Sequence, residues 1–160
     1  MIQERLNIIK SILSGFHPEY TDVNGTPQII ANTNNVIEIC KILKENEETR
    51  FEMLIDAVSI DNFVKENRYE IVYNLYSIKF KYRLFVKVRL DSKEPKMPSL
   101  TAVWESANWY EREAYDMMGI IFTGHPDLRR IYMPEEFEYY PLRKDFPLMG
   151  IPGSLHLPKK

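Results

Sequence analysis

The sequence is poor in the residues that most often build chemical sites. It contains one cysteine, Cys40, and three histidines among its 160 residues. A single cysteine excludes a disulfide within the chain, and it excludes an iron–sulfur cluster held by four thiolates of this chain alone. The histidines show no metal-ligand spacing, so we expect no metal site. Cys40 lies on an apolar helical stripe, which is typical of a core cysteine.

Long apolar runs and an excess of positive charge are also missing. No run approaches the roughly 20 apolar residues that cross a bilayer, and the first residues lack the basic start and apolar block of a signal peptide. The formal net charge of −2 gives no basic field, so we expect no nucleic-acid partner. A membrane would be reached only through another protein.

Motifs of catalysis and cofactor binding are absent as well. The sequence has no Gly-x-Gly-x-x-Gly, Walker loop, nucleophile elbow or Cys-x-x-Cys. Glu111 and Glu113 could be an acid and base pair, but residues two apart on a helix point to different sides. The residues therefore disfavour an acid and base pair on this helix, and none of these cofactor-binding motifs is present.

The hydrophobic pattern predicts an α+β fold. Helical spacing of apolar residues occurs over residues 2–16 and 36–43. A short strand is expected at residues 28–31, and alternation predicts strands over 51–57, 69–75 and 84–90. Short connections favour antiparallel neighbours. We expect two N-terminal helices packed on a mostly antiparallel sheet of about four strands.

A third helix is expected over residues 100–118, capped by Ser99 or Thr101 and ended by Gly119. Its aromatic residues lie on several faces, which favours burial on several sides and therefore an interface helix. Arg112 and Asp116 stand four residues apart and could pair.

A proline-rich arm follows the helix. Six of the ten prolines fall within residues 126–158, interleaved with aromatic side chains. Proline cannot continue a helix or join a central strand, whereas the aromatic content argues against a disordered linker. We expect an α+β domain over residues 1–122 and an extended arm over 123–160. The arm could wrap its own domain, but we expect docking on a partner, because two helices already cover the packed face of the sheet.

Two basic pairs mark the arm. Arg129 and Arg130 follow His125, which the next proline holds in an extended loop, and Arg143 and Lys144 follow Pro141. No glycine-rich phosphate cradle accompanies either pair, so carboxylate clamping at a contact between subunits is the favoured interpretation. A solvated turn after Pro141 is the alternative for the second pair.

Together these residues resemble a known family. The resemblance rests on ANWYERE at residues 107–113, YDMMGI at 115–120, GHPDLRRI at 124–131 and PLRKDFP at 141–147. These runs are similar to the 30-kDa subunit family of respiratory complex I, which is the C subunit of bacterial NADH:quinone oxidoreductase or the J subunit of photosynthetic NDH complexes. The resemblance covers residues 51–147. One departure is Met118, where the family commonly has phenylalanine.

The resemblance implies a non-catalytic, cofactor-free subunit of the peripheral arm, on the cytoplasmic face of the membrane or on the matrix or stromal side in an organelle. It implies a scaffold for the 49-kDa-type subunit beside the quinone site and contacts with other peripheral-arm subunits, supporting electron transfer coupled to ion translocation. The motif positions implied to bind partners are Trp109, Glu111, Arg112, Glu113, Asp116, His125, Pro126, Arg129, Arg130, Arg143, Lys144 and Asp145.

Two alternatives stay open at this point. The chain could be the equivalent subunit of a membrane-bound hydrogenase or of a ferredoxin- or F420-linked complex. It could also be a stand-alone domain that binds a protein or peptide through its arm.

Overall fold

A computed structural model describes residues 2–153. Three helices, seven strands and one 3-10 turn (η1, Ser14–Phe16) make up the regular structure of these residues. The helices are α1 (Ile2–Ile12), α2 (Val36–Glu45) and α3 (Ala107–Met118). The strands are β1 (Glu19–Val23), β2 (Thr26–Ala31), β3 (Met53–Asp61), β4 (Tyr69–Ser77), β5 (Tyr82–Leu90), β6 (Lys96–Pro98) and β7 (Ile121–Thr123).

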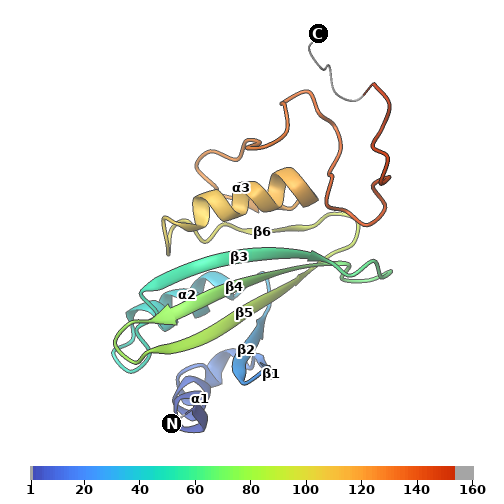
Figure 1. The fold of residues 1–160 in the computed structure, drawn as a ribbon. Helices are drawn as coiled ribbons and strands as arrows, with labels where there is room; N and C mark the ends of the chain where they lie inside the picture. The colour runs from blue at the N-terminus through green and yellow to red at the C-terminus, as the bar shows by residue number, and fades with distance from the viewer. Residues whose placement is uncertain (1, 154–160) are drawn as a thin grey trace.

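The main sheet has five strands in the order β1-β2-β5-β4-β3 (Figure 1). The α+β class is confirmed, but the expected number of about four strands is wrong. The missed strand, β1, pairs with β2 across a turn in which Asn24 and Gly25 both have positive φ, at 52° and 83°. Four of its five residues are exposed, so it lacks the apolar alternation that reveals a strand.

The sheet is mixed, because β2 runs parallel to β5 while the other three pairings are antiparallel. One face carries the core. Tyr69, Ile71, Tyr73 and Leu75 of β4 point into the core and are fully or almost fully buried, together with apolar residues of all three helices. On the opposite face Val58 is 54% exposed, so this side of the sheet meets solvent.

The third helix begins at Ala107 and not at Leu100 as the sequence predicts. Residues 100–104 form turns, in which the Val103 and Trp104 amides both donate to the Leu100 carbonyl. Buried apolar side chains in these turns, such as Leu100 and Val103, imitate a helical stripe. The predicted end is confirmed, because Gly119 adopts φ 74° and donates its amide to the Tyr115 carbonyl.

A small parallel sheet of β6 and β7 holds the segments before and after α3 side by side. Strands of three residues give no periodic signal, and the sequence did not predict them. The helix lies along the free edge of β3, where Tyr110 Oη donates to the Ile55 carbonyl at 2.5 Å. Ser106 Oγ donates likewise to the Leu54 carbonyl, so α3 protects an edge strand.

The arm, orange to red in Figure 1, follows β7 and runs back over α3. Residues 124–153 contain no helix or strand, as the prolines predict. Residues 154–160 of the expected arm lie outside the described part of the chain.

Gly119→Ala tests how α3 and the arm meet. A Cβ at Gly119 would lie 2.5 Å from Arg143 Nη2 and 2.6 Å from Tyr140 Cζ, at a φ that disfavours side chains. We expect a loss of about 1–3 kcal/mol in the free energy of unfolding, measured by urea denaturation. Gly15→Ala is the control, because its Cβ meets no atom within 4 Å. Equal stability of the two variants would contradict this packing.

Candidate functional site

The candidate site is the face of α3 that carries the charged residues, together with the arm that crosses it. Glu111 and Asp116 are 0% exposed and Arg112 is 7% exposed. Buried charges are unfavourable unless they are paired and hydrogen-bonded. The partners of these three side chains therefore determine what the site can do.

Glu111 binds the segment that precedes the helix. Its carboxylate accepts hydrogen bonds from Ser99 Oγ at 2.6 Å, the Leu100 amide at 2.7 Å and Tyr73 Oη at 3.3 Å. Burial raises the pKa of Glu111, and these three hydrogen bonds oppose the shift without cancelling it. Every interaction of this carboxylate ties α3 to β4 and to the turn after β6.

Asp116 binds the arm. Its Oδ2 atom accepts the amides of Ile131, Tyr132 and Met133 at 2.9, 2.6 and 3.0 Å. Its Oδ1 atom accepts Arg130 Nη1 at 2.7 Å. Burial would raise the pKa of Asp116, but the hydrogen bonds from the arm outweigh burial and the pKa is lowered.

The two arginines of the site bind main-chain carbonyls. Arg112 donates from Nε to the Arg129 carbonyl and from Nη2 to the Arg130 carbonyl, at 3.2 and 3.3 Å. Arg130 also donates to the carbonyls of Asp116 and Tyr139. The expected pairing of Arg112 with Asp116 is replaced by the pair between Asp116 and Arg130. Arg112 therefore binds the carbonyls of residues 129 and 130, and Asp116 binds the amides of residues 131–133.

A second clamp holds the arm further along. Asp61, at the end of β3, accepts Arg68 Nη2 at 2.6 Å and the Lys144 amide at 2.8 Å. Arg68 also pairs with Asp145 at 2.9 Å. The hydrogen bond from Arg68 is the main reason why the pKa of Asp61 is strongly lowered. Sequence analysis missed Asp61 and Arg68, because the predicted strand ended at residue 57 and placed both residues in the connection that follows it, whereas β3 extends to Asp61.

Arg143 and His125 complete the attachment of the arm. Arg143 Nε donates to the Met118 carbonyl at 2.8 Å, and its guanidinium lies 4.3 Å from the centre of the Tyr140 ring. His125 Nδ1 accepts the Asp127 amide, which leaves Nε2 to donate to the Asn108 carbonyl at 3.2 Å. Arg143 thus binds the last residue of α3, and His125 binds a residue in its first turn.

An exposed cleft of about 700 Å³ remains beside α3, lined by Trp109, Arg112, Pro126 and Arg129 among others. Trp109 is 62% exposed, and the Arg112 guanidinium lies 4.8 Å from the centre of its ring. Arg129 pairs with Asp127 at the surface. The structure thus brings three of the predicted partner-binding residues, Trp109, Pro126 and Arg129, to one accessible surface.

The other predicted partner-binding residues fall into two groups. Glu113 and Lys144 are exposed. Glu111, Arg112, Asp116, His125, Arg130, Arg143 and Asp145 make the intramolecular bonds described above. Partner contact stays a prediction for all of them.

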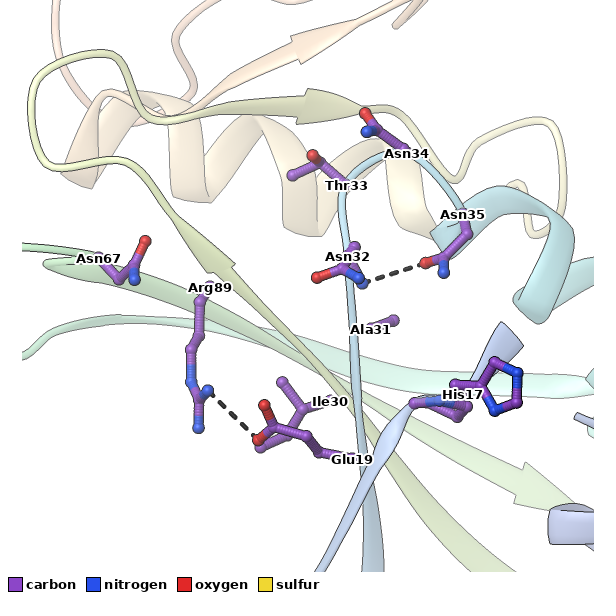
Figure 2. A pocket seen from close by; sticks show the side chains of 11 residues that line it. His17, Glu19, Ile30, Ala31, Asn32, Thr33, Asn34, Asn35, Asn67 and Arg89 are labelled. Carbon is purple, nitrogen blue, oxygen red and sulfur yellow. Dashed lines mark hydrogen bonds and ion pairs between the residues drawn. The ribbon is translucent and has the colours of Figure 1, made fainter. Parts of the chain in front are cut away.

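A second cleft lies where the parallel strands β2 and β5 end. Its volume is about 380 Å³, and none of the predicted residues lines it. Figure 2 shows Arg89 paired with Glu19, and the Asn35 side chain turned onto the Asn32 amide at the start of α2. Two pairs of polar residues that line this cleft therefore bind each other.

Known proteins are similar to this chain in both sequence and fold. The family described as the respiratory-chain NADH dehydrogenase 30 Kd subunit matches residues 29–152. The chain belongs to this family. The resemblance drawn from the α3 and arm motifs is thereby confirmed, and the match begins 22 residues before the expected start at residue 51.

Individual relatives of this chain are C subunits of NADH-quinone oxidoreductase. The NADH-quinone oxidoreductase C 2 subunit of Rhizobium meliloti is 50% identical over 121 residues, which is 76% of this chain and 66% of the relative. The C subunit of the same oxidoreductase in Geotalea uraniireducens is 44% identical over 132 residues, covering 82% and 79%. The chain spans 66% and 64% of the length of two Rhizobium relatives of the family.

Two solved structures share the fold of this family member. A trypsin-resistant fragment (1–134) of Nqo5 has a TM-score of 0.65 and 30% identity, covering 80% of this chain and all of the fragment. A chain of a membrane-bound sulfane sulfur reductase, an archaeal respiratory membrane complex, has a TM-score of 0.77 and 24% identity, covering 91% and 87%. The second likeness concerns the fold alone.

Asp116→Asn tests the first clamp. The amide cannot neutralise Arg130 and presents a donor toward other donors, so we expect release of residues 129–133 at a cost of about 2–4 kcal/mol. Trypsin should then cut after Arg129 and Arg130 faster than in the unchanged protein. Asp127→Asn is the matched control, because the Asp127 side chain is exposed and forms an ion pair at the surface with Arg129. Equal cleavage of both variants would contradict the clamp.

A dependence on pH follows from the same carboxylates. Because the pKa values of Asp116 and Asp61 are lowered, their ionised carboxylates stabilise the docked arm at pH values above the ordinary aspartate pKa of about 3.9. This stabilisation is lost as the pH falls below that value. Hydrogen exchange of the Ile131, Tyr132 and Met133 amides, measured as an opening constant, should increase on acidification to pH 3 before the core strands open. Simultaneous opening of arm and core would contradict the prediction.

Proposed function

We propose that this chain serves as the C subunit of an NADH-quinone oxidoreductase of the complex I type, within its peripheral arm. Family membership and 50% identity to a protein of that name support this proposal. In this role the chain supports electron transfer coupled to ion translocation but carries out no chemistry itself.

The geometry of the charged residues supports a structural role. Glu111, Arg112 and Asp116, the buried charged residues of α3, direct their hydrogen bonds to the chain's own segments. A general acid, base or nucleophile must reach a substrate, and these groups are enclosed by their partners. We infer a scaffold without a cofactor of its own.

The exposed Trp109 cleft is the proposed contact with the 49-kDa-type subunit beside the quinone site. Exposed tryptophan and arginine residues are enriched at the energetic centres of protein interfaces. Among residues 2–153 no helix is long and apolar enough to cross a membrane. We therefore propose that the chain is held at the cytoplasmic face of the membrane, or its organellar equivalent, through the complex.

The names and identities of the relatives favour an NADH-linked complex over a hydrogenase-type or ferredoxin-linked one. The alternative of a stand-alone domain that binds a protein or peptide through its arm does not require the chain to join such a complex. Co-purification with the other subunits of the complex therefore distinguishes the two functions.

Trp109→Ala tests the proposed function. We expect the variant to fold, because Trp109 is 62% exposed. Its co-purification from the native membrane with the NADH-quinone oxidoreductase subunits should decrease at least about tenfold, because interface tryptophans typically contribute about 2 kcal/mol or more. Ile78→Ala, at the 55% exposed turn after β4, is the control. Failure of the unchanged protein to co-purify would overturn the function, and equal yields of both variants would overturn the assignment of the cleft.

A further inference from the structure

The arm contains a hydrogen-bonded turn that follows the first clamp. Phe137 is 3% exposed and its amide donates to the Pro134 carbonyl, which closes the turn. Arg130 donates to the Tyr139 carbonyl and lies 5.8 Å from the centre of the Phe137 ring. The same arginine that neutralises Asp116 therefore also contacts this turn, at the Tyr139 carbonyl and the Phe137 ring.

The outer side of this turn combines aromatic surface with unpaired negative charge. Tyr132 is 61% and Tyr139 is 39% exposed. Glu135, Glu136 and Glu138 are exposed, and none of them takes part in an ion pair of the described residues. Residues 132–140 contain no lysine or arginine to balance them.

A pocket of about 280 Å³ opens beside the turn. Its walls include the rings of Tyr139, Tyr140 and Phe146 and the side chain of Glu138. The other charges of the pocket already have partners, since Asp145 pairs with Arg68 and Arg143 donates to the Met118 carbonyl. Glu138 is the lining charge that remains available to an incoming group.

Aromatic walls and a free carboxylate are the chemistry that recognises a cation. Ring faces attract ammonium and guanidinium groups, and an adjacent carboxylate adds a charge-assisted hydrogen bond. Arg143 already stacks on Tyr140, which shows that one of these rings accepts a guanidinium. An acidic occupant would meet three carboxylates at the rim, which like-charge repulsion disfavours.

We propose that this acidic aromatic turn, residues 132–140, docks on a basic surface of a neighbouring subunit, with one arginine or lysine side chain entering the pocket beside Glu138. The proposal rests on the proposed function, because it requires a complex in which the arm meets another polypeptide. It differs from the Trp109 contact in location and in the chemistry of the partner.

The test replaces Glu135, Glu136 and Glu138 together by glutamine. The control replaces Glu4, Glu45 and Glu48 by glutamine, which removes the same charge from exposed positions on the α1 and α2 side. Both variants are purified within the native complex, and dissociation of the subunit is followed while the NaCl concentration is raised. Equal urea denaturation curves verify that both variants fold.

The arm variant should dissociate at lower NaCl than the control, with at least about fivefold weaker association at low ionic strength, as expected for the loss of three exposed charge contacts. Equal dissociation of both variants overturns the docking proposal, and tighter association of the arm variant indicates an acidic occupant and overturns it too. Absence of the unchanged subunit from the complex overturns the proposed function instead, so the two failures are distinguishable.

Discussion

The fold of the last third of the chain depends on the need to satisfy two buried carboxylates on one helix. Glu111 and Asp116 are both 0% exposed, and removing a carboxylate from water is unfavourable unless hydrogen bonds replace the solvent. Their donors include main-chain amides from two different segments, residue 100 before the helix and residues 131–133 after it. α3 therefore fixes the path of the chain on both of its sides, which a purely apolar helix could not do.

This constraint gives a physical reason for the spacing of the charged residues at positions 111–116. Arg112 and Asp116 are one helical turn apart, so their side chains lie on one face, and one takes carbonyls while the other takes amides of the same crossing segment. Contacts with main-chain atoms require a backbone path and not particular arm side chains. Arg130 adds the charge that Asp116 needs, whereas Glu113, pointing to another side, stays exposed.

The sequence predicted local features well and long-range pairings poorly. Gly119 ended the helix as expected, Cys40 is a fully buried core residue, and the alternating strands β3 to β5 are present. These features depend on neighbouring residues. The pairing of Asp116 with Arg130 depends instead on how the arm returns across α3, and the short distance to Arg112 along the helix suggested the wrong partner. β1 was missed because exposed polar strands have no periodic signal.

The clamps also change how the arm contributes to an interface. A free, proline-rich arm would lose conformational entropy on docking, about 1–2 kcal/mol for each residue whose backbone becomes fixed. Here Asp116, Arg112 and Asp61 already fix residues 129–133 and 144 within the single chain. The loss of entropy then occurs during folding, and the exposed surfaces around Trp109 and Tyr132 would meet the proposed partners in a shape that is already set. Buried charge in this chain thus fixes the path of the arm, and it would preorganise the surface that we propose as a contact.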